Sequence, residues 1–247
     1  MKNRFFYTQS QLENEDTVKL SGEDAYHLLR VLRASVGETL ELCCETGVCR
    51  RAEILAFDKN SVLCRLGDFL SDSESSVQFS VAFGLLKGDK TEFILQKATE
   101  LGAAGFIPFT SGRTVVRPDK ETENRRQRWQ KIIRSAAAQS RRSLIPPIQS
   151  PASWLQLLEL AKSFDKALLF WEGEGGKRLC AVLQNLQPKS RVLLVTGPEG
   201  GFSEEEVFAA KSHGLESVTL GPRILRAETA ALVALAVSLY QVGEMGG

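Results

Sequence analysis

A glycine-rich loop with a carboxylate at its centre is the first feature of this sequence that could do chemistry. The loop, GPEGG at residues 197–201, lies between the apolar run RVLLVT and an acidic segment that begins at Ser203. Such loops commonly hold phosphates through free backbone N–H groups. Here Pro198 removes one N–H group, Glu199 adds a negative charge, and the glutamates at 204–206 occupy the positive end of the following helix. A dinucleotide or a triphosphate is disfavoured, because like charges in a poorly solvated site repel strongly.

A ligand that combines a purine with a positive charge fits this loop better. Two further loops follow apolar runs, WEGEGG at residues 171–176 and LGPRILRAET at residues 220–229. Glycines let backbone groups approach a purine edge closely, and an apolar turn such as Ile224-Leu225 can flank the ring. Carboxylates do not repel a sulfonium, so S-adenosylmethionine is compatible with these loops. A purely structural strand-to-helix connection remains the alternative for GPEGG.

A basic segment in the middle of the chain is typical of a surface that binds a polyanion. Residues 113–142 hold ten lysines and arginines against three acids, whereas the whole chain has a net charge of only +1. This asymmetry favours nucleic acid as a partner, with a solvated helix face as the alternative. The candidate RNA contacts in and outside this segment are Arg30, Arg33, Lys87, Arg113, Arg117, Arg134, Arg141 and Arg142.

The elements that position these residues divide into two patterns. Residues 1–70 contain short alternating runs separated by turn residues, which predict β-strands, and one helix over 22–33 with Leu28, Val31 and Leu32 on its apolar face. They predict a small β-barrel that carries one helix. The polar, acidic run at residues 71–76 is interpreted as a linker.

Beyond the linker, strands alternate with helices. Strands are predicted over 77–86, 105–109, 166–171, 191–196 and 216–220, and helices over 89–101, 125–140, 153–162, 177–186, 203–213 and 228–241. Gly102 is expected to end the first of these helices, and Ser203 with Glu206 has the spacing of a capping box. Near-continuous apolar strands in this order indicate an α/β fold with a parallel sheet covered on both faces. Ligands of such sheets bind at the C-terminal ends of the strands, where all three loops lie.

The remaining composition argues against several classes of protein. Five cysteines in a spacing without a zinc pattern, and two histidines distant from them, favour reduced structural thiols and no metal site. The N-terminus lacks the apolar core of a signal peptide. The longest apolar stretch, residues 230–240, is shorter than the ~20 residues that span a bilayer. A cytoplasmic protein is expected.

At the two C-terminal loops the sequence resembles the RsmE-type 16S ribosomal RNA uridine-N3 methyltransferases of the SPOUT class. The resemblance rests on GPEGGFSEEEV followed by LGPRILRAETA. It continues through HLLRVLR near the start, LLKGDKTEFILQKATELGAAGFIPFTSGR at 85–113 and RWQKII at 128–133, and so spans nearly the whole chain.

This resemblance implies a PUA-like RNA-binding β-barrel over residues 1–72 and a SPOUT methyltransferase domain over 73–247. In the latter, a deep trefoil knot builds the S-adenosylmethionine pocket, and the family works as a homodimer on the 30S subunit. Carried onto this sequence, the cofactor-binding residues are Phe170, Trp171, Gly197, Glu199, Gly200, Gly201, Leu220, Gly221, Ile224, Leu225, Arg226, Thr229 and Ala230. One departure is Ala138, where the family often has glutamate.

The chemistry that the resemblance implies is attack of a uracil ring nitrogen on a sulfonium methyl. Arg226 is the candidate for stabilising the ring anion, and Glu228 or Glu172 for holding the cofactor or removing the ring proton. An ion pair between Arg226 and Glu228 that only braces the fold is the alternative. Rival functions are a SPOUT enzyme acting on another base or a ribose 2′-hydroxyl, and a non-catalytic RNA-binding assembly factor. An oxidoreductase or kinase is disfavoured, because the phosphate motifs are missing.

Overall fold

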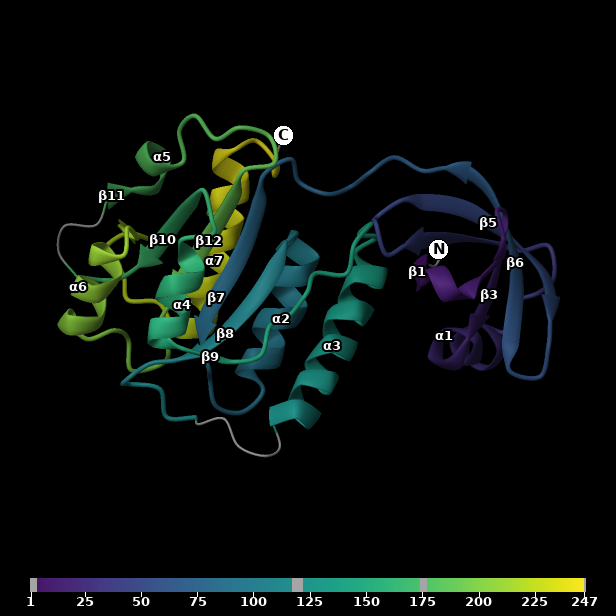
Figure 1. The fold of residues 1–247 in the computed structure, drawn as a ribbon, viewed down its shortest axis with the longest axis horizontal. Coiled ribbons are helices and arrows are strands. Elements are labelled where there is room, and N and C mark those ends of the chain that lie inside the picture. Colours follow the sequence, from purple (N-terminus) through teal and green to yellow (C-terminus); the bar gives the residue numbers. More distant parts are fainter. Residues whose placement is uncertain (1–3, 117–121, 174–176, 247) are drawn as a thin grey trace. The chain divides into compact units, whose positions relative to one another are not determined.

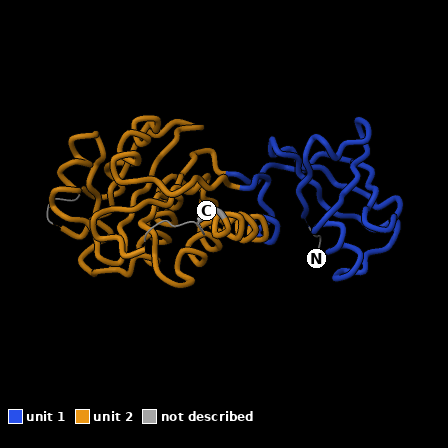
Figure 2. Tube along the Cα trace, turned by 60° about the horizontal axis from the view of Figure 1, so that its bottom comes forward, with its two compact units in different colours: residues 1–74, 137–145 blue, residues 75–136, 146–247 orange. Residues whose placement is uncertain are grey.

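The computed structural model describes residues 4–116, 122–173 and 177–246. The chain divides into two compact units (Figure 2). The first comprises residues 1–74 together with the separate segment 137–145, and the second comprises 75–136 and 146–247. The chain therefore completes the first unit only after it has begun the second.

The first unit is built on a six-stranded sheet of order β1-β4-β5-β6-β3-β2. Its strands are β1 (Arg4–Tyr7), β2 (Leu12–Asn14), β3 (Thr17–Ser21), β4 (Thr39–Cys44), β5 (Cys49–Phe57) and β6 (Ser61–Phe69). β1 pairs with β4 in parallel, and the other neighbours pair antiparallel. The predicted strands of this region are confirmed, because alternating side chains such as Val18, Leu20, Leu42 and Ile54 form one buried cluster.

The helix of the first unit differs from the predicted one in its turn geometry. α1 (Gly22–Tyr26) continues as a π-helical segment, His27–Leu32, which ends at Arg33 in the left-handed conformation. Leu28 is buried as predicted, but Val31 is 58% exposed and Leu32 37% exposed. The wider π-helical turn shifts the buried face, so the prediction for Val31 and Leu32 is wrong.

The expectation that all five cysteines are reduced is also wrong. Cys43 and Cys49 lie directly opposite each other at the ends of β4 and β5, and their sulfurs form a disulfide. Cys44, Cys64 and Cys180 are free thiols. Burial raises the pKa of the Cys64 thiol to about 12, so this cysteine behaves as an apolar core residue.

The polar run at residues 71–76 has no regular structure, but it is tied to the segment 137–145. The Glu74 carboxylate pairs with the Arg142 guanidinium and accepts hydrogen bonds from the backbone N–H groups of Ser143 (2.9 Å) and Leu144 (3.2 Å). The Ser73 hydroxyl donates to the Arg141 carbonyl at 2.9 Å. The boundary between the two units falls inside this run, which agrees with its interpretation as a linker, and its Ser73 and Glu74 side chains also hold the returning segment.

The second unit is an α/β fold around a seven-stranded, wholly parallel sheet of order β11-β13-β10-β12-β7-β8-β9 (Figure 1). Its strands are β7 (Gln78–Gly84), β8 (Gly105–Thr110), β9 (Ala152–Ser153), β10 (Lys166–Phe170), β11 (Lys177–Arg178), β12 (Arg191–Thr196) and β13 (Glu216–Thr219). β12 lies between β7 and β10, although more than a hundred residues separate it from β7. The parallel sheet predicted from the sequence is confirmed.

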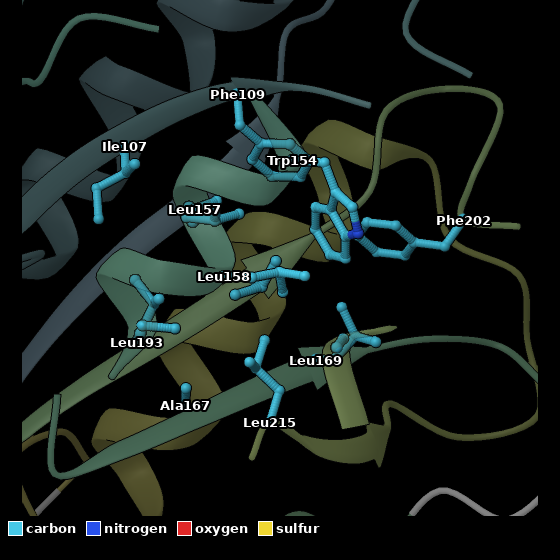
Figure 3. Close-up of a cluster of buried hydrophobic side chains, with 14 of the residues drawn as sticks. Ile107, Phe109, Trp154, Leu157, Leu158, Ala167, Leu169, Leu193, Phe202 and Leu215 are labelled. Carbon is cyan, nitrogen blue, oxygen red and sulfur yellow. The ribbon is translucent and has the colours of Figure 1, made fainter. Parts of the chain in front are cut away.

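Helices cover both faces of this sheet, as the near-continuous apolar strands predict. They are α2 (Lys90–Leu101), α3 (Thr122–Gln139), α4 (Trp154–Ala161), α5 (Leu179–Val182), α6 (Glu204–Ser212) and α7 (Ala227–Gln241). α4 and α6 pack on one face, whose core joins Phe109, Trp154, Leu169 and Phe202 (Figure 3). α2 and α7 pack on each other, and α7 also packs on β7 and β12.

Local end signals are correct for two helices. Gly102 ends α2 in the left-handed conformation, and Ser203 caps α6 in a capping box with Glu206. The helix predicted over 177–186 is wrong in extent, because this stretch forms the short strand β11 and the single turn α5. In the described part of the chain, no helix is long and apolar enough to cross a membrane. No group of three potential metal ligands gathers among the same residues.

Candidate functional site

A cavity of about 340 Å³ opens where the C-terminal ends of β10, β12 and β13 meet. Parallel strands end at the same edge of the sheet, so the loops that follow them converge there. The cavity is lined by Lys90, Phe170, Trp171, Glu172, Gly197, Pro198, Glu199, Gly200, Gly201, Phe202, Thr219, Leu220, Gly221, Arg223, Ile224, Leu225, Arg226, Ala227, Glu228 and Ala230.

Close backbone packing gives the GPEGG loop its shape. A Cβ atom on Gly84, at the end of β7, would lie 2.5 Å from the Pro198 nitrogen, so only glycine permits this approach. Gly200 meets the Arg113 backbone in a similar way, at 3.0 Å, and Gly201 has a φ of +65°. Gly84 therefore belongs to the structural requirements of the site, although it does not line the cavity.

Phe202 anchors the same loop in the hydrophobic core. Its ring stacks on Phe109, with centroids 6.2 Å apart, and lies 5.2 Å from the Trp154 ring (Figure 3). Burying an aromatic side chain contributes roughly 1.5–3 kcal/mol. The loop is therefore held at both ends, by Gly84 and Pro198 on one side and by Phe202 on the other.

The Glu199 carboxylate binds to the segment that leads into α2. Its Oε1 atom accepts hydrogen bonds from the Lys90 Nζ at 3.1 Å and from the Lys87 backbone N–H at 3.2 Å. Burial acts to raise the pKa of Glu199, but these two hydrogen bonds, a third from its own backbone N–H and the charge of Lys90 together outweigh it, and the pKa is lowered. Glu199 is thus an ionised group that links the loop to the start of α2.

Lys90 also approaches a second carboxylate across the cavity. Its Nζ lies 4.0 Å from the Glu228 Oε2 in the first turn of α7. That oxygen is buried and has no hydrogen-bond partner among the described residues. A buried carboxylate oxygen without a donor is costly, so its position at the wall of an open cavity suits a ligand that brings a positive charge or a donor.

The remaining walls are one polar loop and one exposed apolar turn. The Glu172 Oε1 lies 3.1 Å from the position of a Cβ on Gly201, which brings the carboxylate beside the GPEGG loop. Opposite, Gly221 has a φ of +102°, and Ile224 is 85% exposed. Arg226 occupies the N-cap position of α7. Three cations and three carboxylates therefore line one cavity: Lys90, Arg223 and Arg226 with Glu172, Glu199 and Glu228.

The predicted site residues come together with one exception. Thr229 is exposed and does not line the cavity, although its neighbours Glu228 and Ala230 do. Sequence reasoning missed Lys90, Pro198, Phe202, Thr219, Arg223 and Ala227. Five of these six flank predicted residues directly in the sequence and could have been found there. Lys90 could not, because it comes from α2, which is distant in the sequence from all the predicted cavity residues.

The predicted RNA-contacting residues differ in their exposure and in the partners that they already have. Arg30, Arg33 and Lys87 are exposed, and Arg134 is half-buried on α3. Arg113 donates from Nη1 to the Gly200 carbonyl at 3.2 Å. Arg142 is only 6% exposed and pairs with Glu74, while Arg141 is exposed and its carbonyl accepts a hydrogen bond from Arg4. Arg117 lies outside the described residues.

Ala138, where the family often has glutamate, does not belong to the cavity. Its side chain packs against the cluster formed by Phe6, Cys43, Cys49 and Ala137 in the first unit. The methyl side chain therefore serves a hydrophobic contact next to the disulfide.

Comparisons with known proteins agree with this arrangement. Residues 73–239 match the family model of the RNA methyltransferase domain. Over 97% of its length the chain is 37% identical to Ribosomal RNA small subunit methyltransferase E of Bacillus subtilis, covering 96% of that protein. The protein of the same name from Synechocystis is 35% identical over 90% of this chain and 72% of its own length.

A solved structure shares the whole fold. The Ribosomal RNA small subunit methyltransferase E from Neisseria gonorrhoeae, crystallised with S-adenosyl methionine, is 30% identical. It superposes with a TM-score of 0.85 over 97% of this chain and 98% of its own. The similarity therefore includes both units and a relative with a bound methyl donor.

Proposed function

Because this chain belongs to the RNA methyltransferase family whose members include Ribosomal RNA small subunit methyltransferase E, we propose that it methylates N3 of a uridine in 16S ribosomal RNA with S-adenosylmethionine as the donor. The observation that carries this proposal is the convergence of the 197–202 and 219–228 loops on one cavity at the edge of a parallel sheet. The lysine of that cavity, Lys90, lies between the carboxylates of Glu199 and Glu228, an arrangement that disfavours a phosphate.

The cavity fits S-adenosylmethionine in both shape and charge. Glycines 197, 200 and 201 leave the backbone open to a purine edge, and Ile224 and Leu225 offer an apolar surface to its ring. The Glu228 Oε2 atom, which accepts no hydrogen bond from the described residues, suits a cationic or donor group of the same ligand. When bound, S-adenosylmethionine supplies a methyl group on a positively charged sulfur.

The residues of this chain would act on the target base. A uracil N3 carries a proton at neutral pH, so the site must remove it or stabilise the anionic ring. We assign stabilisation of the ring anion to Arg226, whose guanidinium belongs to the cavity wall. Glu228 or Glu172 would hold the cofactor or accept the proton. Holding the base and the donor in line is itself worth roughly 7–11 kcal/mol of the barrier.

The finer fold assignment belongs to the same proposal. We assign residues 73–247 to a SPOUT domain whose 197–202 and 219–228 segments form a deep trefoil knot. Residues 1–72 are assigned to a PUA-like barrel that binds RNA. In support, the segments proposed to form the knot lie together at the cavity, and β12 is inserted between strands that precede it in the sequence.

A homodimer is part of the proposal as well. Between Ala230 and Val237, α7 carries only apolar side chains, yet Val237 is 36% exposed and Tyr240, further along the helix, is 66% exposed. A helix that is hydrophobic all round is normally buried, so a second copy of the chain would cover this side. The cytoplasm, where ribosomal subunits are available, is the proposed location.

The RNA-binding surface that we propose contains fewer residues than the sequence predicts. Arg30, Arg33, Lys87 and Arg134 remain as candidate phosphate contacts. Arg141 remains through its exposed side chain, and Arg117 stays a prediction from the sequence. Arg113 and Arg142 already bind the Gly200 carbonyl and Glu74, so we assign them to shaping the fold.

The decisive experiment is transfer of a labelled methyl group to 30S subunits that lack this modification, with the product nucleoside mapped by mass spectrometry. The expected product is 3-methyluridine in 16S ribosomal RNA. A ribose 2′-O-methyl or another methylated base would point instead to a different SPOUT specificity. Binding of S-adenosylmethionine and of RNA without any transfer would favour a non-catalytic assembly factor.

A further inference from the structure

A second cavity lies in the same unit, beside the loop that follows β7. It has a volume of about 380 Å³ and is formed by the 85–88 loop, the first turn of α2 and the first half of α3. This volume is in the range of ordinary small-molecule sites. Residues 85–92 of the LLKGDKTEFILQ motif contribute to its lining, but the proposed methyl-donor site does not use this cavity.

Positive charge predominates among the residues that line this cavity. Lys87, Arg125 and Arg128 face it with a single carboxylate, Glu92. The Arg128 Nη2 atom donates to the Glu92 Oε2 at 2.7 Å, and Arg125 is also engaged within the protein, so the charge argument rests on Lys87. Lys87 is exposed, and its ammonium group has no carboxylate partner in the described part of the chain. The cavity therefore favours an anionic ligand.

The inner wall of the cavity is apolar. Leu85 and Leu86 are each 4% exposed, and Trp129 is 6% exposed. A cavity lined by buried apolar side chains and by an exposed lysine combines the features that bind a base and a phosphate of a single-stranded nucleic acid.

The two cavities share one loop as a common wall. The backbone N–H of Lys87 donates to Glu199, which lines the methyl-donor cavity, and Lys87 itself lines the second cavity. Lys90 lines the first cavity and Thr91 lines the second. An RNA strand that delivers a base to the first cavity would therefore continue past the second.

We propose that the second cavity binds the nucleotide adjacent to the methylated uridine, with Lys87 on its phosphate. This inference rests on the proposed function, because it names a subsite for the same RNA substrate. The subsite would position the strand before transfer and would not touch the methyl donor.

The test compares Lys87→Ala with Lys97→Ala in methyl transfer to unmethylated 30S subunits at several salt concentrations. Lys97 is also on the α2 side of the unit, pairs with Glu100 at 2.8 Å and lines neither cavity, so its variant controls for the lost charge. Lys87→Ala is expected to raise KM several-fold and to reduce the salt slope by about 0.7–0.9. The affinity for S-adenosylmethionine, measured by calorimetry, should stay unchanged. Equal KM values and salt slopes for the two variants would overturn the proposal.

A second variant should change KM in the opposite direction. Glu92→Gln removes the one carboxylate of the cavity and is expected to lower KM for the subunit, whereas Glu100→Gln on the same helix should leave KM unchanged. A KM for Glu92→Gln equal to or above that of the wild type would contradict the assignment. If the wild type transfers no methyl group, the proposed function fails. Filter binding of 30S subunits to the same four variants then tests the subsite. Lys87→Ala should bind the subunit more weakly than Lys97→Ala, and Glu92→Gln should bind it more tightly than Glu100→Gln.

Discussion

At the residue scale, Glu199 argues against phosphate binding in the sequence, and in the structure it links two elements. Its carboxylate joins the GPEGG loop to Lys90 and to the backbone of Lys87. Because the folded state lowers the pKa of Glu199, the ionised form stabilises the fold. This contribution is fully present above the ordinary pKa of 4.5 and is lost as the pH falls through the lowered value.

Glu199→Gln should therefore lower the free energy of unfolding by about 1 kcal/mol at pH 7, the usual value of a hydrogen bond to a charged group after partial solvent screening. The difference from the wild type should shrink in urea titrations below pH 4.5. Glu204→Gln, in the first turn of α6, serves as the control. A difference that stays constant down to pH 3 would contradict the assigned ion pair.

Gly84 is the second residue whose identity the site requires. Gly84→Ala would place a Cβ 2.5 Å from the Pro198 nitrogen, so the loop must move. Overpacking of this kind costs roughly 1–3 kcal/mol, and calorimetry should give an affinity for S-adenosylmethionine about tenfold weaker. Gly105→Ala, whose Cβ would meet its neighbours at 3.4 Å or more, should leave that affinity unaltered. Equal affinities of both variants would show that the loop is not held by this contact.

Arg226 tests the chemistry assigned to the cavity. Arg226→Ala is expected to reduce the rate of methyl transfer by roughly 10²–10³, the usual cost of losing one group that stabilises transition-state charge. Its affinity for S-adenosylmethionine should change little. Arg223→Ala removes the same charge from the same loop and should lose less activity. Unchanged turnover in Arg226→Ala would remove Arg226 from the mechanism.

At the scale of elements, the capping box of α6 does more than begin a helix. The Glu206 Oε2 accepts from the Ser203 N–H at 2.9 Å, and its Oε1 accepts from the Gly112 N–H at 2.7 Å. Glu206 therefore ties the N-terminus of α6 to the loop after β8, beside the GPEGG loop.

Glu206→Ala should lower the free energy of unfolding by roughly 1–3 kcal/mol, because the variant leaves two backbone donors without this acceptor. Glu204→Ala is a matched control in the same helical turn. Thermal unfolding of both variants measures the difference. Similar losses of stability in the two would mean that Glu206 stabilises the fold only through its interaction with the helix dipole.

Some features of these elements could be predicted from the sequence, and others could not. Gly102 and Ser203 were predictable because a helix end depends on a few neighbouring residues. The exposed Val31 and Leu32 were not, because a π-helical turn leaves no mark in a pattern read at 3.6 residues per turn. The cavity residues of two loops were predictable by resemblance. Lys90 enters the cavity through tertiary packing alone.

At the scale of the whole molecule, the first unit depends on a segment that the chain reaches only after it has begun the second. Residues 137–145 return to it and supply Arg142, which is buried against Glu74. No local pattern in the sequence predicts such a return, because the segment reads as the continuation of a basic helix.

Arg142→Met should destabilise the first unit selectively, by roughly 3–5 kcal/mol, because it leaves the Glu74 carboxylate partly buried without its cation. Calorimetric unfolding should then resolve an early transition that the wild type lacks. Arg141→Met, an exposed neighbour, provides the comparison. A single unshifted transition in Arg142→Met would mean that the pair contributes little.

The position of β12 has a consequence for how the protein is made. β12 is the central partner of β7 and β10, yet its residues 191–196 are among the last of the sheet to be translated. Until they leave the ribosome, β7 and β10 each present an unpaired, apolar edge, which is the kind of surface that aggregates. The two halves of the sheet can join only after synthesis is almost complete. A nascent chain stalled before residue 191 should therefore be protease-sensitive in this unit, and one extended beyond residue 241 should be protected.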